Sequence, residues 1–167
     1  MASEAPIVGV VVGSDSDLAV MERCTRRLES FGIPYEVRVI SAHRSPDVAH
    51  EYASTARHRG LKVLIAAAGM SAALSGVLAS KTALPVIGVP MAVGPLVGVD
   101  AALSTMQLPS GIPVGCMAIG PAGATNAAIF AAQILATGDS ELAGRLAQFK
   151  DDLAASVAQK DAKVQQS

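Results

Sequence analysis

The fold class is indicated by one segment near the N-terminus, Ile7-Val8-Gly9-Val10-Val11-Val12 followed by Gly13-Ser14-Asp15-Ser16-Asp17. The apolar, β-branched run carries no polar alternation, which is typical of a strand that is covered on both faces. The Gly/Ser/Asp segment leads into residues 18–31, where apolar residues recur at helical spacing until Gly32 supplies the stop. A buried strand that passes directly into an amphipathic helix predicts one unit of a parallel α/β sheet.

The same strand-and-helix unit recurs along the rest of the chain. Further strands are predicted at residues 33–40, 62–67, 84–89 and 114–119. The predicted helices cover residues 45–59 (with Ser45 as N-cap and Pro46 in the first helical position), a short segment that ends at Lys81, residues 100–107, and a segment after residue 124 that ends near Gly138. With right-handed crossovers, this alternation predicts an α/β fold: a flavodoxin-like, three-layer αβα sandwich around a five-stranded parallel sheet.

The C-terminal segment, residues 139–164, follows a different pattern. Its apolar residues fall at steps of three or four, opposite a charged side; they are Leu142, Leu146, Phe149, Leu153 and Val157. This pattern predicts an amphipathic helix with one narrow apolar stripe. The stripe packs either on its own domain or on a neighbouring subunit, and the sequence leaves both open. We predict one domain over residues 1–167, with a core at about residues 7–138 and this helix after it.

The composition bears on assembly. Hydrophobic residues make up 51% of the chain and charged residues only 16%, against about 25% in typical soluble domains. One interpretation is that oligomerisation buries surface that a monomer would expose. The other is an alanine-rich composition that raises the mean hydropathy without any structural consequence.

The charge pattern excludes several classes of partner. The net charge is −1 and no run of Lys and Arg occurs, so we expect no nucleic-acid binding. Residues 63–70, the longest strongly apolar stretch, are too few to span a membrane, and the acidic segment at residues 1–6 lacks the positive region of a signal peptide. The two cysteines fit no metal spacing, and reduced thiols in a cytoplasmic protein are the simplest interpretation.

Functional residues are expected in the loops after the strands, because ligands of such sheets bind beyond the carboxyl ends of the strands. In the first loop, Gly13 permits close approach of the backbone and Ser14 places a hydroxyl at the positive end of a helix, which suits a phosphate. Asp17 can accept hydrogen bonds from ribose hydroxyls. Ordinary helix capping by Ser and Asp explains the same residues equally well.

The second loop, Ser41-Ala42-His43-Arg44-Ser45-Pro46, carries a richer signal. Arg44 is suited to a bidentate contact with a phosphate. The imidazole of His43 is suited to moving a proton. The alternative is a surface His beside a surface Arg, and a surface position is what we expect for His50 and His58 on the following helix.

The third and fourth loops carry almost no charge. Residues 66–76 are small and apolar, which leaves room for a flat or small apolar ligand or allows tight packing of helix on sheet. Residues 90–98 and 107–111 are expected to form rigid walls or subunit contacts. The sequence has no GxSxG elbow, no suitable carboxylate pair and no metal-ligand cluster. The pattern therefore favours metal-free proton transfer on a phosphorylated small molecule.

A non-catalytic module of the same fold is the rival hypothesis. A receiver domain needs a phospho-acceptor Asp after the third strand, but the chain has Ala67-Ala68-Gly69 there. A flavodoxin usually covers its flavin with aromatic rings, and only 3% of this chain is aromatic. Both features disfavour the rival.

Several segments, taken in order, resemble the PurE family of purine biosynthesis. They are Gly13-Ser14-Asp15-Ser16-Asp17, Ser41-Ala42-His43-Arg44-Ser45-Pro46-Asp47, Pro85-Val86-Ile87-Gly88-Val89-Pro90, Gln107-Leu108-Pro109-Ser110-Gly111-Ile112-Pro113-Val114-Gly115 and Asn126-Ala127-Ala128. The resemblance runs from about residue 7 to residue 146. It implies a flavodoxin-like homo-octamer without metal or organic cofactor, acting on a small ribonucleotide and CO2.

The resemblance also implies a role for each matching residue. Ser14, Asp17 and Arg44 match the nucleotide-binding residues, and His43 matches the acid/base histidine. The other residues expected to bind the substrate or line the site are Gly13, Ser41, Ala42, Gly69, Ser71 and Leu74.

Two activities within the family stay open. Its bacterial members are N5-carboxyaminoimidazole ribonucleotide mutases, and a second class carboxylates aminoimidazole ribonucleotide directly with CO2. Bacterial mutases usually carry His and then Leu-Pro-Gly in the third loop, where this chain has Ala73-Leu74-Ser75-Gly76. That form resembles the direct carboxylases, which usually have Lys where this chain has Arg44. Most of the chain favours the mutases.

Overall fold

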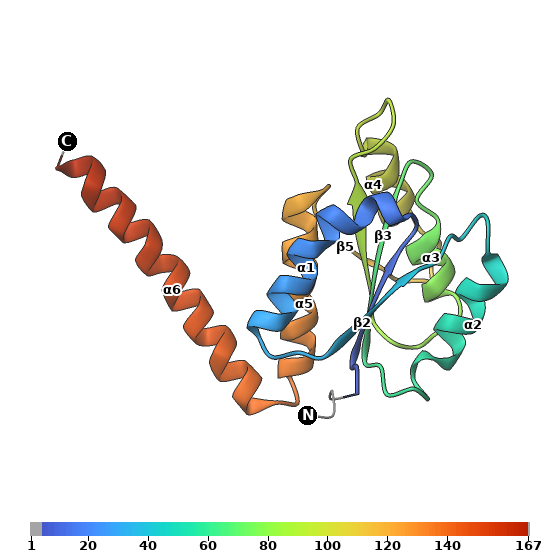
Figure 1. Ribbon diagram of the computed structural model, residues 1–167, viewed down its shortest axis with the longest axis horizontal. Helices are drawn as coiled ribbons and strands as arrows, with labels where there is room; N and C mark the ends of the chain where they lie inside the picture. Colours follow the sequence, from blue (N-terminus) through green and yellow to red (C-terminus); the bar gives the residue numbers. More distant parts are fainter. Residues whose placement is uncertain (1–4, 167) are drawn as a thin grey trace.

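A parallel sheet of five strands, in the order β2-β1-β3-β4-β5, forms the centre of the molecule (Figure 1). The computed structural model describes residues 5–166, and the segment Met1–Glu4 and Ser167 lie outside that range. The strands are β1 (Val8–Val12), β2 (Tyr35–Val39), β3 (Val63–Gly69), β4 (Val86–Met91) and β5 (Gly115–Cys116). The predicted five-stranded parallel sheet is confirmed.

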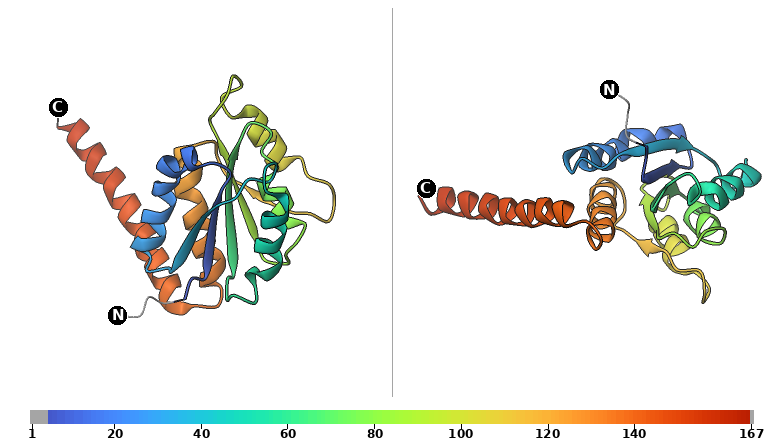
Figure 2. Two further views of the ribbon diagram at one scale, coloured as in Figure 1. Left: turned by 45° about the vertical axis from the view of Figure 1, so that its right-hand side comes forward. Right: turned by 90° about the horizontal axis from the view of Figure 1, so that it is seen from below.

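Helices cover both faces of the sheet and complete three layers, as Figure 2 shows. One face carries α1 (Leu18–Ser30) and α5 (Pro121–Ala136), and the other carries α2 (Pro46–Ala56), α3 (Leu74–Ala79) and α4 (Val99–Met106). A short 3-10 turn, η1 (Asp15–Asp17), precedes α1. The predicted αβα sandwich is therefore confirmed as well.

The alternation of side chains along each central strand divides the core in two. Val8, Val10 and Val12 of β1 pack on the side of α1 and α5, whereas Val11 packs on the side of α2 and α3. Because successive side chains point to opposite faces and both faces are covered, every residue of β1 and β4 is buried. The buried face of α5 is built from small side chains, so that this helix lies close to the sheet; they are Gly123, Ala124, Ala127, Ala128, Ala131 and Ala132.

The strand boundaries differ from the prediction at the carboxyl end of the sheet. β3 and β4 both end two residues later than expected, and their last residues, Gly69 and Met91, pair with each other. β5 is much shorter than the predicted residues 114–119. The physical reason is Pro90. Its carbonyl accepts a hydrogen bond from Gly120 and so faces β5, but proline has no N–H with which to continue that ladder.

The C-terminal helix α6 (Ser140–Gln165) begins after Asp139, whose carboxylate accepts a hydrogen bond from the Leu142 amide at 3.0 Å. Its first turns pack on their own domain. Leu142 is buried, and the Phe149 ring meets the Phe31 ring edge-on, with centroids 5.5 Å apart. The rest of α6 projects away from the body (Figure 1), and the later stripe residues Leu153 and Val157 are exposed. Packing on its own domain therefore accounts for the first half of the stripe only.

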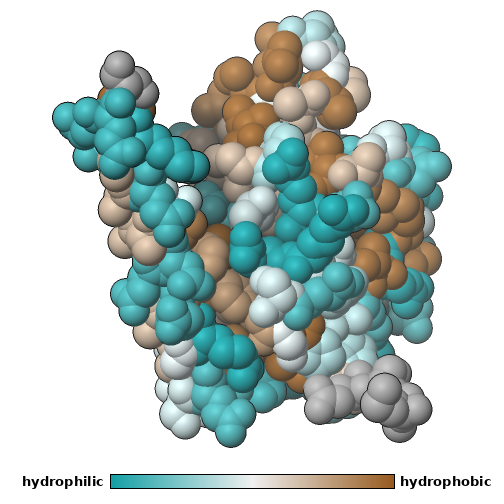
Figure 3. Space-filling view, turned by 60° about the vertical axis from the view of Figure 1, so that its left-hand side comes forward, coloured by the Kyte–Doolittle hydropathy of each residue, from teal (hydrophilic) through white to brown (hydrophobic). Residues whose placement is uncertain are grey.

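A second group of apolar side chains lies on the surface beside α4. The large exposed residues there are Val93, Leu96, Val97, Val99, Leu103 and Met106. Figure 3 shows brown atoms gathered at the top of the molecule, over α4 and the loop at residues 92–98 that precedes it. A contiguous apolar patch is typical of a protein–protein contact. Within residues 5–166, none of the helices combines the length and the hydropathy that crossing a membrane requires.

Candidate functional site

A cavity of about 430 Å³ opens at the carboxyl end of the sheet, between the loops that follow β1, β2, β3 and β4. All the residues that the sequence analysis expects at the site border it: Gly13, Ser14, Asp17, Ser41, Ala42, His43, Arg44, Gly69, Ser71 and Leu74. The other bordering residues are Ser16, Ala68, Met70, Ala73 and Val93. Val93 could not be singled out from the sequence, because it lies in a loop without any titratable group.

The first loop is held in shape by its own hydrogen bonds. Ser14 Oγ accepts from the Ser16 amide at 3.3 Å and from the Ser16 hydroxyl at 2.9 Å. Asp15 Oδ1 accepts from the Ser16 amide at 3.0 Å. Ser14 thereby caps η1, as the sequence also allowed, whereas Asp17 is the N-cap of α1 without a side-chain capping bond. Asp17 is only 4% exposed, and burial raises the pKa of its carboxyl. The loop therefore brings hydroxyls and one buried carboxyl to the cavity in a fixed arrangement.

The second loop is closed by two serines. The Ser45 hydroxyl donates to the Ser41 carbonyl at 3.0 Å and accepts from the Ser41 amide at 3.2 Å. The Ser41 hydroxyl in turn accepts from the Arg44 amide at 3.2 Å. Ser45 is the N-cap of α2 and Pro46 its first residue, as predicted, although the Ser45 side chain makes no capping bond within the helix. The hydroxyl turns back to Ser41 and fixes the segment between them.

His43 and Arg44 lie in the segment that these serines close. Both side chains are exposed and border the cavity. Neither has a hydrogen-bond or ion-pair partner among residues 5–166, so both are available to a ligand. His50 of α2 is half-buried and His58, just beyond α2, is exposed, and neither borders the cavity.

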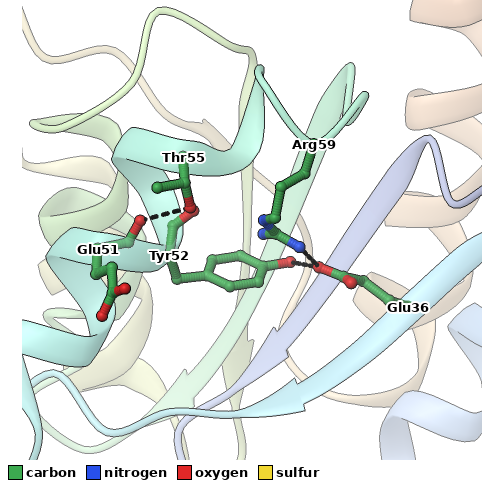
Figure 4. Close-up of polar contacts among 5 residues, drawn as sticks. All are labelled: Glu36, Glu51, Tyr52, Thr55 and Arg59. Carbon is green, nitrogen blue, oxygen red and sulfur yellow. Dashed lines mark hydrogen bonds and ion pairs between the residues drawn. The ribbon is translucent and has the colours of Figure 1, made fainter.

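A polar cluster joins the two elements that flank this loop (Figure 4). Glu36 of β2 accepts hydrogen bonds from the Tyr52 hydroxyl of α2 at 2.8 Å and from the Arg59 guanidinium at 2.7 Å. Arg59 also lies over the Tyr52 ring, 4.6 Å from its centroid. Burial opposes ionisation of Glu36, but the bonds from Arg59 and Tyr52 outweigh it and lower the pKa of the carboxyl. The cluster thereby fixes α2 against the sheet edge from which the His43 loop departs.

The third and fourth loops lock into each other. A Cβ added at Gly69 would stand 1.9 Å from Cγ2 of Val93, so the valine occupies the space that any larger residue would need. A Cβ added at Gly94 would stand 3.3 Å from Cγ of Met70. The Val93 side chain therefore packs on Gly69, and the Met70 side chain packs on Gly94.

The cavity combines two chemically different sides. Arg44 and the hydroxyls and amides of the first loop suit a phosphate, and His43 is placed to move a proton. The opposite side is apolar, with Met70, Ala73, Leu74 and Val93. Within the described residues, no three His, Cys, Asp or Glu side chains are grouped so as to hold a metal ion. The arrangement can bind a phosphorylated molecule and transfer a proton beside an apolar compartment.

Comparisons with known proteins cover nearly the whole chain. The sequence model of the AIR carboxylase family matches residues 7–156. The N5-carboxyaminoimidazole ribonucleotide mutase of Pyrococcus horikoshii is 49% identical over 160 residues, 96% of this chain and 89% of that protein. The mutase of Mycobacterium tuberculosis H37Rv is 49% identical over 164 residues, 98% of this chain and 93% of that protein. The crystal structure of Treponema denticola PurE is similar with a TM-score of 0.81 and 30% identity, over 95% of this chain and 98% of that one.

Proposed function

The chain belongs to the AIR carboxylase family, and we propose that it is an enzyme that converts N5-carboxyaminoimidazole ribonucleotide into 4-carboxy-5-aminoimidazole ribonucleotide in purine biosynthesis. The two relatives described above are named as mutases that carry out this isomerisation. The observation that carries the proposal is the convergence of His43, Arg44 and the Gly13–Asp17 loop on one cavity with an apolar side.

Substrate binding follows from the polar side of the cavity. The guanidinium of Arg44 and the amides and hydroxyls of the first loop hold the phosphate of the ribonucleotide. The Asp17 carboxyl accepts a hydrogen bond from a ribose hydroxyl. These contacts direct the aminoimidazole ring toward His43 and the apolar side.

The reaction then requires that one proton is added to N5 and that one proton is removed from C4. The N5–carboxyl bond breaks, N5 takes up a proton, and CO2 is released into the apolar part of the cavity. The nucleophilic C4 attacks this CO2, a C4–carbon bond forms, and the C4 proton leaves, which restores the aromatic ring. His43 is the group that delivers and accepts these protons, so it ends in its starting state. Retention of CO2 next to C4 gives it a high effective concentration.

Direct carboxylation of aminoimidazole ribonucleotide is the second candidate. It is supported by the segment Ala73-Leu74-Ser75-Gly76. Ala73 borders the cavity, but its side chain has no group that can carry a proton. Among residues 5–166, His43 is then the single imidazole on the cavity wall. In this reaction only the second half of the sequence occurs, with CO2 taken from solution.

One assay separates the two reactions. The purified protein is given either N5-carboxyaminoimidazole ribonucleotide, or aminoimidazole ribonucleotide with bicarbonate, and formation of the C4-carboxylated product is followed. We expect fast conversion of the first substrate and slow conversion of the second. The reverse order would identify the direct carboxylase, and no conversion of either would reject the enzyme and favour a binding module.

The remaining features of the proposal concern the whole chain. Residues 1–167 form one domain, with a core at about residues 7–138, and the chain assembles as a homo-octamer in the cytoplasm. The exposed patch beside α4 and the projecting half of α6 support an assembly, because both leave apolar side chains uncovered. Sedimentation velocity and cell fractionation test these two statements.

A further inference from the structure

We propose that Val93 is a specificity-determining residue that keeps the released CO2 inside the cavity and thereby decides whether the carboxyl group is transferred or lost. The inference rests on the proposed function, because CO2 is an intermediate only in that reaction. It assigns a chemical task to the fourth loop, from which no titratable residue reaches the site.

The position of Val93 is fixed by its neighbours. Its Cγ2 fills the space above Gly69, only 1.9 Å from where a Cβ would stand. The reciprocal contact of Met70 with Gly94 holds the two loops together from the other direction. Met70 has a φ of 54°, a conformation that non-glycine residues adopt rarely. The apolar wall is thus held in place by two loops that leave each other little freedom.

The chemistry of the wall suits CO2 better than water. Val93, Met70, Ala73 and Leu74 present no side-chain hydrogen-bond donor, and the one polar neighbour in this part, Ser71, is exposed. CO2 has no net dipole and loses little when it leaves water, whereas a water molecule here would lack partners. Val93 is 37% exposed in the single chain, which places it at the rim of the apolar compartment.

The released CO2 has two possible outcomes, retention in the cavity or escape from it. If CO2 stays, C4 adds to it and gives up its proton, and the product is the C4-carboxylated ribonucleotide. If CO2 escapes, the N5–carboxyl bond has been replaced by an N5–H bond, and aminoimidazole ribonucleotide is left. A polar group at position 93 would stabilise water at the opening and shift the division toward escape.

The test uses Val93→Thr, which exchanges a methyl for a hydroxyl on a β-branched side chain of nearly the same shape. The substrate carries 13C in its N5-carboxyl group, and the solution contains excess unlabelled bicarbonate. The ratio of aminoimidazole ribonucleotide to labelled product is measured, after subtraction of decarboxylation without enzyme. We expect Val93→Thr to raise this ratio about fourfold, the factor that corresponds to one buried methylene. Val93→Ala is the second variant and is expected to raise it as well.

Val97→Thr is the matched control, since Val97 lies on the same loop, is exposed and does not border the cavity. It is expected to leave the ratio unchanged. If Val93→Thr and Val93→Ala keep the ratio of the unmodified protein, or if Val97→Thr raises it equally, the inference about Val93 is wrong while the proposed function stands. If the unmodified protein does not transfer the label at all, the proposed function itself fails.

Discussion

His43 carries the proposed proton transfer from an exposed position in which no other group of residues 5–166 binds it. We expect His43→Asn to lower turnover by a factor of about 10²–10⁴, because a positioned acid/base group contributes that much. Binding of the ribonucleotide should persist, since the smaller amide of Asn keeps a polar hydrogen-bonding group and the phosphate contacts lie elsewhere. Turnover and the dissociation constant are measured separately. His58→Asn, an exposed histidine away from the cavity, is the control, and near-normal turnover of His43→Asn would remove the assigned role.

Arg44 has the complementary task of holding the phosphate. We expect Arg44→Ala to raise the dissociation constant of the ribonucleotide about 10- to 100-fold, the usual effect of losing hydrogen bonds to a charged group. Arg44→Lys should recover part of the affinity, because it restores the charge but not the planar fork. Calorimetric titration gives both values. Arg57→Ala, an exposed arginine beyond the cavity, serves as the control. An unchanged constant for Arg44→Ala would show that the phosphate lies elsewhere.

At the scale of elements, Glu36 links β2 to α2 through Tyr52 and Arg59. The pKa of Glu36 is lower in the folded protein than its ordinary value of 4.5. Its ionised form therefore stabilises the fold at pH values above the ordinary pKa, and this stabilisation is lost as the pH falls through the lower, folded value. We expect Glu36→Gln to destabilise the protein at about pH 7 and to differ less from the unmodified protein below about pH 4.

Urea unfolding at several pH values measures this difference. Glu51→Gln is the control, because Glu51 is exposed on α2 beside Tyr52 and its side chain does not enter the cluster. If Glu36→Gln lowers the free energy of unfolding by the same amount at every pH, the charge of Glu36 does not contribute to stability.

The order of elements could be predicted from the sequence, but some of their ends could not. Buried strands appear as apolar runs, and glycines and prolines mark most of the turns, so local pattern is sufficient for the topology. The end of the β4–β5 ladder depends on the side to which Pro90 faces, which is a property of strand register. The contact of Ser45 with Ser41 likewise depends on the fold of the loop rather than on the N-cap pattern.

The same distinction applies to the site. His43 and Arg44 could be predicted because their chemistry is visible in the residue types and in their place after a strand. Val93 has no such chemistry. Its role at the cavity depends on the missing side chain of Gly69 at the end of β3, and this contact exists only once β3 and β4 are paired.

At the scale of the whole molecule, α6 divides into two parts. The first is anchored by Leu142 and Phe149, and Arg27 lies 4.7 Å from the centroid of the Phe149 ring. In the second part the apolar stripe has no partner among residues 5–166, with Leu153 at 48% and Val157 at 65% exposure. A helix that continues well past its own domain has this character where a second subunit covers it.

We expect the double variant Leu153→Lys/Val157→Lys to weaken the assembly, because charged groups would then have to be buried at the contact. Sedimentation velocity should show the unmodified chain as an oligomer and the variant as smaller species, while circular dichroism confirms an intact fold. Lys150→Glu, on the charged side of the helix, is the control. Equal sedimentation of the double variant and the unmodified chain would place the subunit contacts outside this half of α6.

The chain has no tryptophan and only two tyrosines, and each of them donates a hydrogen bond to a glutamate. Ultraviolet emission therefore originates from Tyr35 and Tyr52, at one margin of the molecule, and carboxylate acceptors quench it. Thermal unfolding of the protein should therefore increase its tyrosine fluorescence rather than decrease it. The fluorescence signal would report the unfolding of β2 and α2, which flank the His43 loop, and would not report on the other strands directly.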